Sequence, residues 1–277
     1  MPPGIVLIMR SALGLLVVTC VLASGCAGTI TPPKTAPAPA PREALLVLPG
    51  FGYSRDGERA IKALAPAMEA EGIDLYVPAY VTRAGLENSR ETLRKFIRAQ
   101  QLERYSRVHV FAFIAGGWTF NPLVEDAQLL PNLASVIYDR SPYQERAPRI
   151  AADKLKVLAW LRYGPVLFDI ARTPYGGLPR QGVKVGLIVE TTPTAFVRKY
   201  QKAARAYGPF DFDCQAFAQP HDDCIFVAIN HTELYTRFGE VWPELRTFMR
   251  DNRFTARAER VPPQHDTLAA TAAKGTR

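Results

Sequence analysis

The chain has 277 residues, 48% of them hydrophobic and 22% charged, and its formal net charge is +8 at pH 7. Its basic residues are scattered instead of gathered in a run, and no nucleic-acid-binding motif accompanies them, so the charge does not indicate a nucleic-acid partner. The charge suits a surface that faces anionic lipid or an envelope polymer, and the alternative is an ordinary solubilising surface.

The first part of the chain has the features of a secretory signal. Arg10 precedes an apolar stretch over residues 12–23, which is too short to span a bilayer comfortably. The run Leu-Ala-Ser-Gly-Cys that ends at Cys26 resembles a bacterial lipobox, which implies a lipoprotein signal peptide over residues 1–25 and lipidation of Cys26. A plain secretory signal is the alternative. Ala27 in place of aspartate implies sorting to the outer membrane, so we expect an envelope lipoprotein that faces the periplasm, with the membrane as partner through its anchor.

The segment after the signal predicts a linker and then one domain. Residues 26–42 contain five prolines among alanines, a composition typical of an extended, semi-rigid tether. Residues 43–254 have a length that suits one domain with a sizeable core. Residues 255–277 are polar and alanine-rich and are predicted to be disordered.

Short apolar runs alternate with helical patterns along the domain, which predicts an α/β fold with a mostly parallel central sheet flanked by helices. Buried strands are expected at residues 44–48, 73–77, from 107 onward, 134–138, 183–189 and 224–229. Helices are expected at residues 56–71, 86–101 and 238–250. A helical, aromatic-rich insertion over residues 147–179 interrupts the alternation, and it is expected either to roof a cleft or to pack as an extra core helix.

Cys214 and Cys224 are the only cysteines that remain after the signal and the lipidation site. An oxidising periplasm would join them in a disulfide, and two free thiols are the alternative.

The strand that begins at Arg107 runs into the small residues Ala115, Gly116 and Gly117, as a buried strand does when it enters a tight turn and a helix. In hydrolases this turn is the nucleophile elbow Gly-x-Ser-x-Gly. Residues 112–116 read Ala-Phe-Ile-Ala-Gly, so Ile114 stands where the serine would be. Isoleucine has no oxygen for nucleophilic attack.

Three segments together resemble the α/β-hydrolase superfamily, specifically its bacterial triacylglycerol lipases and esterases. They are residues 46–52 (Leu-Val-Leu-Pro-Gly-Phe-Gly), the elbow at 112–116, and residues 229–234 (Ile-Asn-His-Thr-Glu-Leu) before the last helix. The resemblance implies the α/β-hydrolase fold. It also implies an oxyanion loop that uses the amides of Phe51 and Ala115, with Pro49 in place of the usual histidine.

The same resemblance implies that His231 is the general base, oriented by an acid that precedes it. Asp211 lies nearest the expected place of this acid, and Asp213, Asp222 and Asp223 are the alternatives. Ser54 and Ser141 are other hydroxyl candidates, but neither lies on the elbow.

The remaining histidines show no metal-ligand spacing, so no metal and no cofactor are predicted. His109 is expected to be a core residue, whereas His221 and His265 lie in a loop and in the tail. The function that we expect is a catalytically inactive, membrane-tethered pseudo-hydrolase that binds a lipid or acyl ligand or an envelope protein. The alternatives are an active carboxylic-ester hydrolase with another nucleophile or an activated water, and an envelope scaffold factor.

Overall fold

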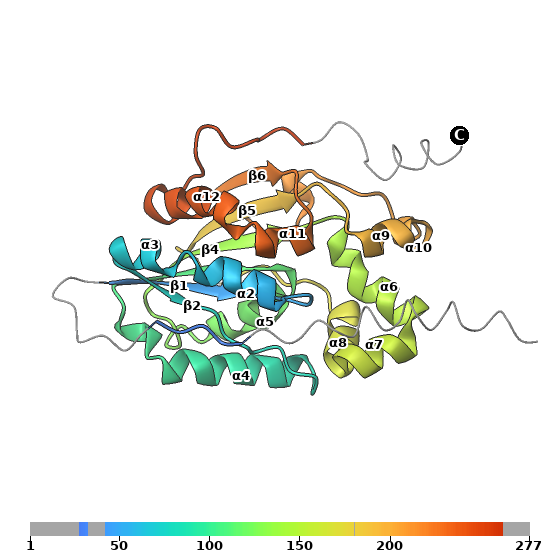
Figure 1. Cartoon of the computed structure of the whole chain (residues 1–277), viewed down its shortest axis with the longest axis horizontal. Helices are drawn as coiled ribbons and strands as arrows, with labels where there is room; N and C mark the ends of the chain where they lie inside the picture. Colours follow the sequence, from blue (N-terminus) through green and yellow to red (C-terminus); the bar gives the residue numbers. More distant parts are fainter. Residues whose placement is uncertain (1–27, 33–41, 180, 263–277) are drawn as a thin grey trace, which may run out of the picture.

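The computed structural model describes residues 28–32, 42–179 and 181–262 (Figure 1). The predicted signal peptide and the predicted lipidation site Cys26 lie outside these residues, as do most of the predicted tether and the last part of the predicted tail. Within the described ranges, no helix is long and apolar enough to cross a membrane.

The centre of the domain is a six-stranded sheet in which every neighbouring pair of strands is parallel. The strand order is β2-β1-β3-β4-β5-β6. This confirms the predicted fold class. The strands are β1 (Glu43–Leu48), β2 (Ile73–Tyr76), β3 (Arg107–Ala112), β4 (Leu133–Arg140), β5 (Lys184–Glu190) and β6 (Asp223–Val227).

Both faces of the sheet are covered by helices, and this explains why the central strands are continuous apolar runs. One face packs on α4 (Leu86–Ala99), α5 (Ile114–Phe120) and the short helices α9 (Ala195–Lys199) and α10 (Gln201–Arg205). The other face packs on α2 (Arg55–Lys62), α3 (Ala65–Ala70), α11 (His231–Thr236) and α12 (Phe238–Asp251). Short 3-10 helices complete the chain: η1 (Leu102–Arg104), η2 (Asn121–Glu125), η3 (Gln144–Arg146) and η4 (Cys214–Ala216).

One long helix was predicted at residues 56–71, and the structure divides it into α2 and α3. Pro66 has no amide hydrogen to donate to the carbonyl of Lys62, four residues earlier, and α2 ends at Lys62. The break therefore follows from the proline.

The predicted insertion forms three helices, α6 (Ala147–Lys154), α7 (Lys156–Tyr163) and α8 (Pro165–Arg172). Figure 1 shows them grouped beyond the sheet, on the side toward which the strand arrows point. The carboxylate of Asp169 on α8 accepts a hydrogen bond of 2.9 Å from the amide of Leu86, at the start of α4. This bond fixes α8 beside the carboxyl ends of the strands, where ligand sites of parallel sheets lie.

The described ends of the chain differ from the predicted domain limits of 43 and 254. Ile30, placed in the predicted tether, forms an antiparallel bridge with Val77 and is buried in the core. Glu259, placed in the predicted disordered tail, forms an antiparallel bridge with Phe226 of β6. These segments pack on the domain because each pairs with backbone groups at one edge of the sheet.

Candidate functional site

The turn between β3 and α5 has an unstrained backbone. Phe113 is extended, with φ −61° and ψ 161°, and Ile114 is the first residue of α5. Among the described residues, the only non-glycine residues with positive φ are Gln101 and Asn252, far from this turn in sequence. A nucleophile elbow is a strained turn, so this turn has the position of an elbow between strand and helix but not its strain.

Gly116 allows α5 to pack closely on β1, as the small residues of the motif predict. A Cβ atom at Gly116 would lie 2.8 Å from the carbonyl oxygen of Leu48. No side chain fits at that distance, so glycine is required there.

Ile114 is buried, with 6% of its surface exposed, in an apolar cluster between the start of α5 and the insertion. Its partners in this cluster include Leu86 of α4 and Val166 and Ile170 of α8. The space directly above the turn is therefore filled by side chains, which agrees with the expectation that the insertion roofs this position.

His231 begins α11 and is also buried, with 6% of its surface exposed. Asn230 fixes this helix start through a capping box with Glu233. The Nδ1 atom of His231 lies 3.0 Å from Oδ2 of Asp139 and 3.1 Å from Oε1 of Glu190. The histidine predicted as the base thus has two carboxylate partners on one nitrogen.

Asp139 and Glu190 come from the carboxyl ends of the neighbouring strands β4 and β5, and both are fully buried. Asp139 pairs in register with Ile188, and Glu190 pairs with Val227. The parallel register brings both acids to the same edge of the sheet, beside the start of α11. We call Asp139, Glu190 and His231 the acid–histidine cluster.

Burial and charge determine how protons are shared in this cluster. Burial lowers the pKa of His231, but the charges and hydrogen bonds of Glu190 and Asp139 outweigh it and raise the pKa to about 10. Burial, together with the charge of Asp139, raises the pKa of Glu190 well above its ordinary range. Burial also raises the pKa of Asp139, against the hydrogen bond from His231.

One oxygen of each acid, Oδ1 of Asp139 and Oε2 of Glu190, is buried without a hydrogen-bond partner among the described residues. Two ionised carboxylates with unpaired buried oxygens would be very costly. The arrangement that agrees with all three pKa shifts is a cationic His231, an ionised Asp139 and a protonated Glu190 in hydrogen-bond contact with Asp139. Such a cluster has no net charge, and its histidine already holds the proton that a general base must accept.

Asp211, the acid predicted from the sequence, does not contact His231. It is exposed, and its Oδ1 accepts a 2.9 Å hydrogen bond from the amide of Asp213. Asp213 in turn caps η4 by accepting from the amide of Gln215. The two aspartates shape the loop before Cys214, and the acids beside His231 are Asp139 and Glu190 instead.

The two other aspartates considered also have separate partners. Asp222 bonds the side chain of Lys184 at 2.9 Å, and Asp223 accepts from the amide of Phe254 at 2.9 Å. Both lie at the start of β6, whereas His231 follows the end of that strand. The length of β6 therefore separates them from the site.

The loop after β1 lies against the first turn of α5, as the oxyanion prediction requires. A Cβ atom at Gly50 would lie 3.1 Å from the Cβ of Ala115. However, the amide of Gly50 already donates a buried 2.8 Å hydrogen bond to the hydroxyl of Tyr235. Phe51 packs edge-on against Tyr163 of α7, with ring centroids 5.0 Å apart. The loop is thus held by internal contacts.

The two serines considered as other nucleophiles have structural partners. Ser54 caps α2 by accepting from the amide of Gly57 at 3.3 Å. Ser141 is fully buried and accepts from the amide of Gln144 at 3.1 Å. Neither is on the β3–α5 turn.

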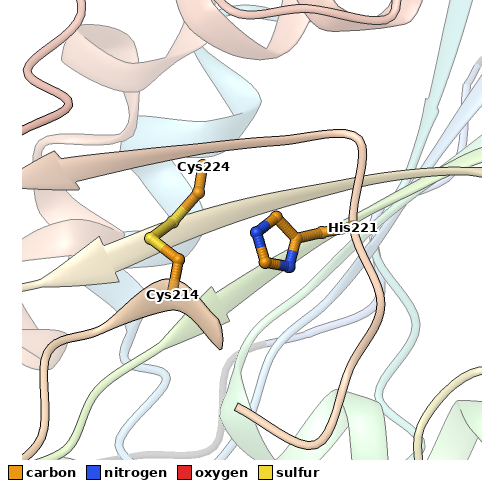
Figure 2. Close-up of side chains that lie close together, drawn as sticks. All are labelled: Cys214, His221 and Cys224. Atoms are coloured by element: carbon orange, nitrogen blue, oxygen red, sulfur yellow. A yellow bond between two sulfur atoms is a disulfide. The ribbon is translucent and has the colours of Figure 1, made fainter. Parts of the chain in front are cut away.

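Cys214 and Cys224 form the predicted disulfide, with their Cα atoms 6.5 Å apart. Figure 2 shows the imidazole of His221 next to this bond. These three residues place possible metal-ligand atoms within 4.8 Å of one another, as do the three residues of the acid–histidine cluster. In the first group the disulfide occupies both sulfur atoms, and in the second group hydrogen bonds already hold the nitrogen, so neither group presents a free set of ligands.

His109 is a fully buried core histidine whose two ring nitrogens both have partners. Nδ1 lies 2.7 Å from the hydroxyl of Ser135, and Nε2 lies 3.2 Å from the carboxylate of Glu43. His265 lies outside the described residues.

A pocket of about 160 Å³ lies on the outer side of α5, where Trp118 and Asn121 face the segment around Thr173. Ile114, His231 and the two buried acids are not among its lining residues. The pocket is therefore separate from the candidate site.

The sequence matches no family model and no curated protein. Similarity is found among solved structures. The mature form of the lipase BlEst2 from Bacillus licheniformis has a TM-score of 0.50 at 13% identity, over 80% of this chain and 99% of that one. The propeptide form of the same lipase has a TM-score of 0.57 at 13% identity, over 86% of this chain and 56% of that one. The chain therefore has an α/β-hydrolase-like fold, and identity at this level shows the fold alone.

Proposed function

We propose that this protein is a catalytically inactive α/β-hydrolase-like lipoprotein that is tethered through Cys26 and acts in the cell envelope by binding a lipid or an envelope partner. The observation that carries the proposal is the pair formed by Ile114 and its surroundings. A branched apolar side chain begins α5 where a hydrolase of this fold has its nucleophile, and it is packed beneath α8.

The state of the histidine supports the same conclusion. A serine hydrolase needs a neutral imidazole that can accept the proton of the nucleophile. His231 has a pKa raised to about 10 and is therefore protonated at neutral pH. Here the acid–histidine cluster serves as a buried ion pair that joins β4, β5 and α11.

The oxyanion loop supports it as well. Preorganised amides in a hydrolase point at the oxygen that becomes charged. The amide of Gly50 instead donates to Tyr235 within the core. Substituting serine for Ile114 would therefore supply an oxygen, but neither a free base nor a strained turn to present it.

The experiment is covalent labelling of the purified protein with a fluorophosphonate probe, together with hydrolysis of short and long p-nitrophenyl esters. We expect no labelling and no hydrolysis from the wild type, nor from Ile114→Ser. An active serine esterase serves as the positive control, and His231→Gln gives the background rate. Labelling of the wild type, or ester hydrolysis that disappears in His231→Gln, would overturn the proposal and favour an active ester hydrolase.

A further inference from the structure

One helix carries nearly all the large apolar side chains that the described part of the chain leaves exposed. Five large hydrophobic residues are exposed, and four of them lie on α7: Val157 (70%), Leu158 (43%), Trp160 (54%) and Leu161 (54%). The fifth is Val261. Apolar side chains gathered in this way mark an interaction surface, whereas single ones need no explanation.

The four side chains form one continuous face of α7. At about 100° per residue, they fall within about 160° of the circumference of the helix. Ala159, on the opposite side, has 4% of its surface exposed and belongs to the cluster that contains Leu167 and Phe168 of α8. The helix is thus attached to the domain by its alanine side, and its largest apolar side chains point to solvent. Figure 1 shows α7 on the outside of the insertion, away from the sheet.

Basic residues border this apolar face. On the same helical projection Lys156 lies just beyond one edge of the face and Arg162 just beyond the other. Residues 154–168 contain three basic residues and no acidic one. Exposed Arg83 adds a further cation at the end of α7, where it donates to the carbonyl oxygen of Trp160 at 3.4 Å.

The charge identifies the kind of partner. Protein–protein interfaces are depleted of lysine around their apolar centres. Helices that lie in a membrane interface have the opposite composition: tryptophan and leucine on the buried face, with lysine and arginine beside it. The stems of Lys and Arg then cover apolar surface while their charged ends reach lipid phosphates.

We propose that α7 docks the domain on an anionic phospholipid bilayer. Val157, Trp160 and Leu161 enter the boundary between headgroups and acyl chains, and Lys156 and Arg162 contact lipid phosphates. This contact is independent of lipidation at Cys26, and it stands whether or not the acid–histidine cluster is catalytic. Its consequence is a fixed orientation: the insertion faces the membrane and the sheet lies behind it.

The test uses the full chain with Cys26→Ser in every sample, so that no acyl chain contributes. Vesicles of phosphatidylglycerol mixed with phosphatidylcholine are compared with vesicles of phosphatidylcholine alone. Trp160 is the exposed tryptophan, since Trp118 and Trp242 are only 8% and 7% exposed. We expect anionic vesicles to shift its emission to shorter wavelength, and brominated acyl chains to quench it. Trp160→Phe should abolish both signals.

Variants then separate the apolar and the charged contributions. Val157→Ser and Leu161→Ser should each weaken binding by about tenfold, the effect of one large apolar side chain. Val261→Ser, which removes an equally exposed side chain elsewhere, should leave binding unchanged. Lys156→Gln should reduce binding and its salt dependence, whereas Lys95→Gln on α4 should change neither. These substitutions are all at exposed positions, so the domain should remain folded by circular dichroism.

Three results would overturn the proposal. The first is unchanged emission with anionic vesicles. The second is an equal loss of binding in Val261→Ser. The third is a dimer in solution that Leu161→Ser dissociates, because α7 would then be covered by a second copy of the chain.

Discussion

The amide of Gly50 and the hydroxyl of Tyr235, 185 residues apart in the sequence, form a buried hydrogen bond of 2.8 Å. The bond joins the loop after β1 to α11, the helix that begins with His231. It therefore couples the predicted oxyanion loop to the histidine of the candidate site.

Tyr235→Phe should lower the free energy of unfolding by about 1–3 kcal/mol, because the amide of Gly50 would remain buried without an acceptor. The stacking of this ring on Phe113, at 4.1 Å between centroids, would be retained. Tyr53→Phe is the matched control, since the hydroxyl of Tyr53 is buried without a partner among the described residues. Urea denaturation should find the control neutral or slightly more stable, and equal losses in both variants would contradict the assignment.

Stability should fall as the pH rises from about 6.5 to about 10. His231 has its pKa raised from 6.5 to about 10, so the unfolded chain loses this proton first and the folded chain retains it across that range. The stabilisation is complete below pH 6.5 and is lost as the pH approaches 10, at about 1.4 kcal/mol per pH unit for each proton that the folded state retains. The raised pKa of Glu190 acts in the same direction.

Two other groups have the opposite sign at lower pH. Burial lowers the pKa of His109, which therefore contributes stability that is lost as the pH falls below 6.5. A hydrogen bond from His109 is the main cause that lowers the pKa of Glu43, so its contribution is lost below about 4.5. The range above pH 6.5 thus isolates the acid–histidine cluster. Urea midpoints across this range should decline for the wild type and change much less for His231→Gln; parallel curves would show that His231 is not protonated in the folded state.

The two acids of the cluster should respond differently to neutral substitutes. Glu190→Gln replaces a protonated carboxyl with an amide of the same shape, and it should change the free energy of unfolding by less than about 1 kcal/mol. Asp139→Asn removes the charge that balances His231, and it should cost about 3–5 kcal/mol. Urea denaturation gives both values, and NMR titration of the imidazole should show a lower pKa for His231 in Asp139→Asn. The reverse order would place the proton on Asp139.

The disulfide between Cys214 and Cys224 closes a loop of 10 residues. Removing it should lower stability by about 2–3 kcal/mol, because the unfolded chain regains the freedom of that loop. The double variant Cys214→Ser/Cys224→Ser and the reduced wild type should have the same lowered denaturation midpoint, with the variant insensitive to reductant. Two free thiols in the unfolded, unreduced wild type would exclude the bond.

The sheet could be predicted from the sequence because its parallel strands are buried on both faces, which makes them continuous apolar runs. The same rule hid part of the site. The predicted strands at 134–138 and 183–189 stop immediately before Asp139 and Glu190, because a charged residue was taken as the end of a buried run. In the structure both strands continue through these acids.

His231 could be found because its surroundings are local: Asn230 caps the helix that it begins, and the motif lies within a few residues. Its acids lie 92 and 41 residues earlier in the chain. Only the register of β4 and β5 brings them together, and no spacing in the sequence encodes that register. An acid that directly follows the apolar run of a buried strand is nevertheless a signal that could have singled out both residues.

The bridges made by Ile30 and Glu259 affect how this protein behaves when it is shortened. The sheet has two open sides, at β2 and β6, and a terminal segment of the chain occupies part of each. Amides of Val77 and Phe226 donate to these segments at 2.8 Å. A fragment trimmed to residues 43–254 would expose those amides on both sides, and unpaired strand edges recruit strands from other molecules. Such a fragment should aggregate where residues 28–262 stay monodisperse, so the two short segments act as guards against self-assembly.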